Sequence, residues 1–89
     1  MNAVVSVVGK DAVGIIAKVS AVCAEYNANI LDITQKVIHD YFTMIMIVEI
    51  DALNIPFSDF IDRMELFGKE NALDVRTMHE DIFNAMHRI

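Results

Sequence analysis

Residues 42–50 read Phe-Thr-Met-Ile-Met-Ile-Val-Glu-Ile, and this stretch decides the fold. It is too short for a typical helix and is bounded by polar turn residues, so it predicts a β-strand. The expected apolar residues of one face are Phe42, Met44, Met46 and Val48, and those of the other are Ile45 and Ile47. Because apolar side chains point to both faces, the strand is expected in the middle of a sheet rather than at an edge.

The segments on either side of this strand also predict strands. Residues 30–38 alternate: Leu31, Ile33 and Val37 are expected on one face, and Asp32, Thr34 and Lys36 on a wetter one. Residues 39–41 form the expected turn. Residues 3–8 are rich in β-branched side chains and predict a buried strand. Residues 73–78 predict a last, short strand.

Helical periodicity fills the gaps between these strands. Asp11 is an expected N-cap, because its carboxylate can accept a hydrogen bond from a backbone N–H two or three residues later. Asn27 to Asn29 should end this helix, since asparagine tolerates the left-handed conformation. The apolar stripe of the first helix comprises Val13, Ile16, Val19, Cys23 and Tyr26, and that of a second, after Pro56, comprises Phe57, Phe60, Ile61, Met64 and Phe67. A helical tail is expected from Glu80.

The order β-α-β-β-α-β plus a tail predicts an α+β fold, the ferredoxin-like βαββαβ sandwich. We expect a four-stranded antiparallel sheet with two helices on one face, a short C-terminal helical tail, and residues 1–89 as a single domain. Right-handed crossovers place the first and third strands in the middle of the sheet. Because both helices cover one face, the other face is expected to be open and apolar.

Composition points to an assembly. Counted with glycine and without tyrosine, apolar residues make up about 56% of the 89 residues, against about 45–50% in ordinary soluble domains. A membrane span does not explain the excess, because the most apolar stretch, residues 42–48, is far shorter than the ~18–20 residues required. A buried partner surface does explain it. We therefore expect a homodimer or a higher homo-oligomer.

Charge and cysteine content exclude other classes. The net charge is −6 and the seven basic residues are scattered, which argues against nucleic-acid binding. A lone cysteine, Cys23, cannot form an internal disulfide and lies on an apolar helical stripe, where it is expected to be a core residue. No secretory signal pattern opens the sequence, so the cytoplasm is the expected location.

Motifs for catalysis or cofactors are absent. Gly9 and Gly14 have the spacing of a P-loop, but Ile15 and Ile16 stand where its lysine and hydroxyl residue are required. His79-Glu80 begins like a zinc-protease helix, but Phe83 replaces the second histidine. We expect no enzyme activity, no metal and no cofactor.

Two short segments carry a resemblance to a known family. Residues 9–15 read Gly-Lys-Asp-Ala-Val-Gly-Ile, and residues 29–31 read Asn-Ile-Leu. They resemble the Gly-x-Asp-x-x-Gly-apolar turn and the Asn-Ile-Leu strand entry of the ACT domain, a small regulatory module that commonly binds amino acids. The resemblance covers essentially the whole chain. Residues 32–35, 41–44 and 79–89 look like small stand-alone ACT proteins related to the glycine-cleavage-system repressor.

The resemblance implies a ligand site between protomers, against the first loop and the start of the first helix. Backbone N–H groups of Val13, Gly14 and Ile15 would then bind the carboxylate of an amino acid. Asn29, beside Ile30, would accept a hydrogen bond from its ammonium group. Asp11 is either a second partner of the ammonium or only the N-cap. Gly14 either admits the ligand or only packs the helix.

Two functions follow as alternatives. The first is a non-catalytic module that senses an amino acid at a homodimer interface and acts allosterically. The second is an interaction subunit that regulates a protein partner without binding a metabolite, through the open sheet face and the apolar tail residues Ile82, Phe83, Met86 and Ile89.

Overall fold

The computed structural model describes residues 1–10 and 13–87. Strands and helices follow one another in the predicted order. The elements are β1 (Asn2–Gly9), α1 (Ile15–Glu25), β2 (Asn29–Ile38), β3 (Tyr41–Glu49), α2 (Phe57–Glu70), β4 (Asp74–His79) and α3 (Glu80–Met86). Each predicted strand is present, with ends that differ by a residue or so from the sequence pattern.

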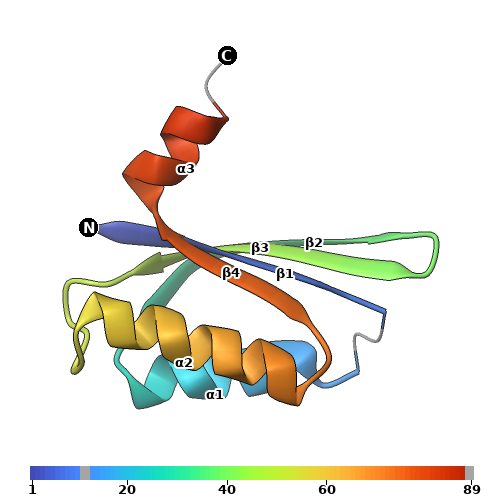
Figure 1. Cartoon of the computed structure of the whole chain (residues 1–89), viewed down its shortest axis with the longest axis horizontal. Coiled ribbons are helices and arrows are strands. Elements are labelled where there is room, and N and C mark those ends of the chain that lie inside the picture. The colour runs from blue at the N-terminus through green and yellow to red at the C-terminus, as the bar shows by residue number, and fades with distance from the viewer. Residues whose placement is uncertain (11–12, 88–89) are drawn as a thin grey trace.

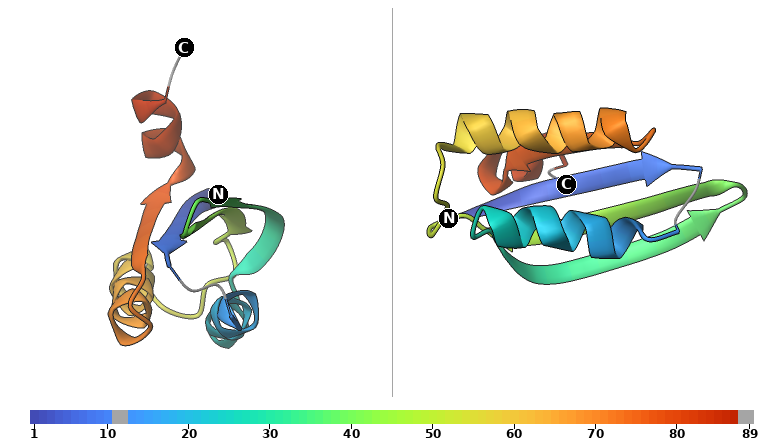
Figure 2. Two further views of the ribbon diagram at one scale, coloured as in Figure 1. Left: turned by 90° about the vertical axis from the view of Figure 1, so that its right-hand side faces the viewer. Right: turned by 90° about the horizontal axis from the view of Figure 1, so that it is seen from below.

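The four strands form one antiparallel sheet in the order β2-β3-β1-β4. The prediction that the first and third strands are central is therefore confirmed, as is the ferredoxin-like fold. α1 and α2 lie side by side on one face of the sheet, and α3 projects from the other (Figures 1 and 2). Within the described residues no helix is long and apolar enough to cross a membrane.

The core lies between the sheet and the two long helices. The two central strands contribute every second side chain to it, as their alternation predicts. The buried strand residues are Ala3, Val5 and Val7 of β1 and Phe42, Met44, Met46 and Val48 of β3. Phe60, Met64 and Phe67 of α2 and Val19, Val22 and Cys23 of α1 pack against them.

The first helix starts later than its sequence pattern predicts. Gly14 occupies the N-cap position, with a left-handed φ of 73°, and Ile15 is the first helical residue. The predicted stripe is therefore wrong at its beginning: Val13 precedes the helix and is 82% exposed, and Ile16 is partly exposed, whereas Ile15 is buried. The predicted N-cap, Asp11, lies outside the described residues.

The second strand differs from a regular alternation at one point. The register with β3 shifts between Ile30 and Asp32, which leaves Leu31 as the extra residue of a β-bulge. Ile30 and Ile33 consequently pair with core residues of β3 on the helix side, and Leu31 is half exposed. The prediction that Leu31 shares a face with Ile33 is wrong for this reason.

Candidate functional site

The first loop and the start of α1 lie at one end of the sheet. Gly14 closes the loop, and its carbonyl accepts the first helical hydrogen bond from the Lys18 N–H at 3.0 Å. The N-cap residue is a glycine and offers no side-chain acceptor to the first-turn N–H groups, which lack partners within the helix. Ile15 points into the core and holds this helix end against the sheet. A helix N-terminus of this kind favours an anion.

Lys18 adds positive charge at this helix end, and Lys10 lies near the hairpin that joins β2 and β3. The Nζ atom of Lys10 lies 5.9 Å from the centroid of the Tyr41 ring, at the beginning of β3. The Lys18 side chain passes Gly14, and its Nζ donates a hydrogen bond to Asn71 Oδ1 at 3.3 Å. The positive charge here contrasts with the net charge of −6 of the whole chain. The surroundings of Gly14 therefore suit a carboxylate.

Asn29 and Ile30 lie at the opposite end of the sheet. Asn29 begins β2 and pairs with Glu49, which also pairs with Asn2. At the other end, Gly9 and Val37 both pair with Phe42. Val37 lies eight positions after Asn29, a span of ~26 Å at the usual rise of a strand. Asn29 is exposed and Ile30 half-buried.

One chain therefore does not bring the predicted site residues together. Val13, Gly14 and Ile15 form one group, and Asn29 and Ile30 form another at the far end of α1. The carboxylate and the ammonium of a free amino acid are attached to the same carbon atom, so a single ligand cannot reach both groups within one chain. A site that uses both groups requires a second copy of the chain.

The edge strand β2 is the side of the molecule that lies next to both groups. Eight of its ten residues are exposed. Several of these are apolar: Leu31, Val37 and Ile38, with Val37 67% exposed. Because β2 is an edge strand, it presents unpaired backbone groups along its outer side. A free edge with exposed apolar side chains is typical of a strand that pairs with another chain.

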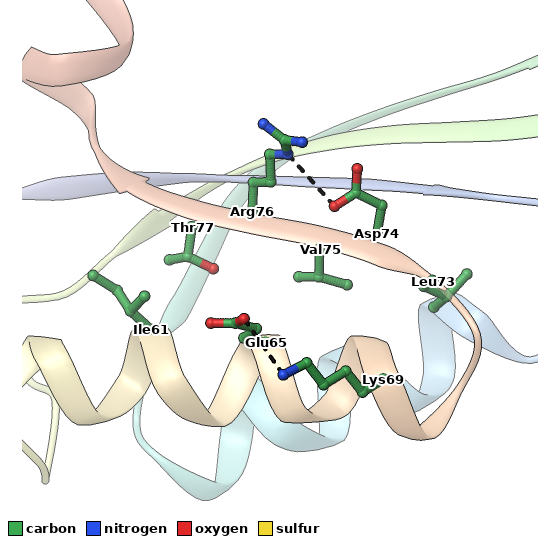
Figure 3. Close-up of a pocket in the computed structure, with 8 residues that line it drawn as sticks. All are labelled: Ile61, Glu65, Lys69, Leu73, Asp74, Val75, Arg76 and Thr77. Carbon is green, nitrogen blue, oxygen red and sulfur yellow. Dashed lines mark hydrogen bonds and ion pairs between the residues drawn. The ribbon is translucent and has the colours of Figure 1, made fainter.

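A pocket of about 450 Å³ lies between α2 and the opposite edge strand, β4 (Figure 3). Ile61, Leu73 and Val75 give it apolar walls. Its four charged side chains form two ion pairs, Glu65–Lys69 at 3.7 Å and Arg76–Asp74 at 3.4 Å. No sequence pattern indicated this pocket, because its residues come from α2, from β4 and from the segment between them and match no motif. Two acidic and two basic side chains line it, so its charge favours neither an anion nor a cation, and we assign it no ligand.

The Cys23 thiol and the N-terminal amine are held by contacts that stabilise the fold. Burial raises the pKa of the Cys23 thiol to about 11, so this cysteine stays protonated in the core, as predicted. A hydrogen bond from the N-terminal ammonium to the Asp51 carboxylate, at 2.6 Å, raises the pKa of the terminal amine. Among the described residues, no three His, Cys, Asp or Glu side chains are grouped as a metal site would require.

Comparison with known proteins identifies relatives along the whole chain. The family model of the ACT domain matches residues 2–77. A UPF0237 protein of Clostridium perfringens is 49% identical over 89 residues, which is the full length of both chains. A UPF0237 protein of Methanocaldococcus jannaschii is 48% identical over 86 residues, covering 97% of this chain and 96% of the relative.

Solved structures give the same result. An ACT domain protein from Streptococcus pneumoniae superposes with a TM-score of 0.83 at 39% identity, covering 98% of each chain. A structure described as a glycine cleavage system transcriptional repressor superposes on 85% of this chain and 43% of its own, with a TM-score of 0.68. At 22% identity, the second likeness concerns the fold alone.

Proposed function

The chain belongs to the ACT domain family, and on that premise we propose that it is a regulatory module that senses an amino acid at the interface between two copies. The proposed role is binding without catalysis. The observation that carries the proposal is the separation of the two predicted ligand-binding groups at opposite ends of the sheet, which only a second copy can reunite.

The first half of the proposed site binds the ligand carboxylate. The N–H groups of Val13, Gly14 and Ile15 surround the start of α1, where the helix dipole favours a negative charge. Lys18, whose side chain passes Gly14, contributes further positive charge. No Cβ at Gly14 blocks the approach of the ligand to the backbone. The start of the helix, with its dipole, and the lysine beside Gly14 together support a carboxylate at this position.

The second half comes from the partner. If two β2 strands pair antiparallel about a two-fold axis, Asn29 of one copy lies beside the Val37 end of the other β2, and Val37 is aligned with Gly9 at the first loop. The side-chain oxygen of Asn29 can then accept a hydrogen bond from the ligand ammonium. The two-fold axis gives two equivalent sites per dimer, and each uses the loop of one copy and Asn29 of the other.

Exposed apolar residues at the start of α1 and along β2 support this arrangement. Val13 and Ile16, at the start of α1, and Leu31, Val37 and Ile38, along β2, are all exposed apolar residues. Pairing through β2 would bury side chains of this group and satisfy the backbone groups of the strand edge. Because a ligand that binds only the dimer stabilises it, the amino acid would control the fraction of paired chains.

A thermal-shift screen of all twenty amino acids tests the proposal. We expect at least one of them, at millimolar concentration, to raise the melting temperature of the chain. Bound at a hundredfold excess over Kd, a ligand contributes about 2.7 kcal/mol to the folded state. For a chain of this size, that is a rise of roughly 10 °C or more. If none of the twenty shifts the melting temperature, the amino-acid function is wrong.

The alternative function, an interaction subunit without a metabolite, is favoured by a different observation. Ile82 and Met86 of α3 are 55% and 64% exposed, and Ile45 on the open sheet face is 44% exposed. The two α3 side chains pack on the side of β1 and β4, and Ile45 lies on the open face of the central strand β3. An interaction subunit would give a negative result in the amino-acid screen, so the same experiment separates the two functions.

A further inference from the structure

The sheet face opposite α1 and α2 carries a second cavity, which the proposed amino-acid site does not use. Here α3 packs against β1 and β4 and borders an open pocket of about 580 Å³, which we call the α3 pocket. Figures 1 and 2 show α3 on the far side of the sheet from the two long helices. Its volume is in the range of small-molecule sites, about 300–1,000 Å³.

The end of the α3 pocket nearest the helix is apolar. Val4 and Met78 pair across β1 and β4, and both line the pocket. Phe83 and Met86 of α3 line the wall above them. Val4 is only 1% exposed, although it points away from the core beneath the sheet, so its surroundings on this face are densely packed. The side chains at this end favour an apolar ligand body.

Two residues further along β1 and back along β4, the paired side chains are polar. Ser6 pairs with Arg76 on one side and with Ile45 on the other, so a hydroxyl and a guanidinium lie side by side in the pocket. The His87 ring, whose centroid lies 4.4 Å from that of Phe83 at an interplanar angle of 42°, lines the same pocket. The pocket is therefore apolar at one end, with hydrogen-bond donors and a positive charge at the other.

The Arg76 guanidinium is positioned to bind a carboxylate. Its Nε atom contacts Asp74 at 3.4 Å. Its two terminal nitrogens form no ion pair within the described part of the chain, and a planar guanidinium binds carboxylates with two parallel hydrogen bonds. None of the described residues that line the pocket is acidic, so an ammonium group would have no charged partner there. This charge distribution favours a carboxylate without an amine.

We propose that the α3 pocket binds a small monocarboxylate with an apolar body, such as a short fatty acid or a branched-chain 2-oxo acid. The carboxylate would contact Arg76 and Ser6, and the apolar body would lie against Phe83 and Met86, the accessible apolar side chains of α3 in the lining. The proposal is independent of the amino-acid site, because no residue belongs to both.

Two fluorescent probes test the proposal on the full chain. 8-Anilinonaphthalene-1-sulfonate has an apolar body and one anionic group, and N-phenyl-1-naphthylamine has nearly the same body without the charge. We expect the anionic probe to bind with increased fluorescence. The substitution Arg76→Gln should weaken the anionic probe about tenfold, as expected for the loss of a charge-assisted contact, and leave the neutral probe unchanged.

A matched control and two competitors complete the experiment. Lys36→Gln removes a positive charge from the same sheet face at the distant edge strand and should not change the affinity of either probe. Octanoate and 4-methyl-2-oxopentanoate should displace the anionic probe. The one that displaces it at the lower concentration shows whether the pocket prefers a fatty acid or a 2-oxo acid. Leucine, which carries an ammonium, should not displace it.

Three results would overturn the proposal. One is the absence of fluorescence enhancement, and another is equal weakening by Lys36→Gln and Arg76→Gln, which would mean general surface attraction. The third is a probe fluorescence per chain that rises when the protein is diluted. Such a rise would show that a second copy of the chain covers the pocket. Arg76→Gln should retain the melting-temperature shift given by amino acids, so the two proposals can fail separately.

Discussion

Replacing Gly14 by aspartate is expected to abolish the amino-acid-dependent rise in melting temperature while leaving the chain folded. An added Cβ has only Lys18 Cε nearby, at 3.9 Å, and aspartate tolerates a φ of 73° better than most residues. Its carboxylate, however, would repel the ligand carboxylate and compete for the same N–H groups. The loss should reach the full ligand contribution, about 2.7 kcal/mol at a hundredfold excess over Kd.

The control for this substitution is Gly14→Asn, which has nearly the same shape and no charge. If electrostatic repulsion is the cause, the asparagine variant should keep part of the ligand response that the aspartate variant loses. Thermal melts of both variants, with and without the amino acid, measure the difference. An aspartate variant that responds like the wild type would exclude a carboxylate site at the start of α1.

The substitution Phe60→Ala should have the largest effect on folding. Phe60 is completely buried in α2, and its ring lies 6.4 Å from that of Tyr26, centroid to centroid, at the end of α1. It therefore joins the two helices beneath the sheet. Removing the ring leaves a cavity that should cost about 3–5 kcal/mol. This is a large part of the total stability of about 5–15 kcal/mol that is usual for domains.

Urea denaturation followed by circular dichroism measures this loss. Leu66→Ala in the same helix is the control, because Leu66 is 51% exposed and its truncation should change the free energy of unfolding by no more than about 0.5 kcal/mol. If Phe60→Ala were no more destabilising than Leu66→Ala, the helix layer would not depend on Phe60 as the packing indicates.

Much of the fold could be predicted because the strands and helices have different periodicities. The alternation in residues 42–50 correctly indicated a central strand with apolar residues on both faces. Asn27 ends α1 in the left-handed conformation, with a φ of 60°, as its residue type suggested. The start of α1 was predicted incorrectly because Val13, Ile15 and Ile16 are all apolar, so the apolar spacing fits two starting positions. Only the backbone angle at Gly14 distinguishes them.

The candidate site was less predictable because it depends on the arrangement of elements. Gly14 and Asn29 were both identified from short motifs, but their sequence positions did not show that they lie at opposite ends of the sheet. No sequence motif indicated the α3 pocket. Ser6 and Arg76 are 70 positions apart and meet only through the β1–β4 register.

A mixed dimer tests the central claim, that two copies share each amino-acid site, most directly. Gly14→Asp and Asn29→Ala should each abolish binding in a pure dimer, because every site then lacks one half. In a dimer that contains one chain of each kind, isolated with two different affinity tags, one site combines both defects and the other has none. Calorimetric titration with the amino acid selected by the screen should then find half the wild-type number of sites, with wild-type affinity. A mixed dimer that binds no amino acid, when the wild-type dimer does, would contradict a shared site.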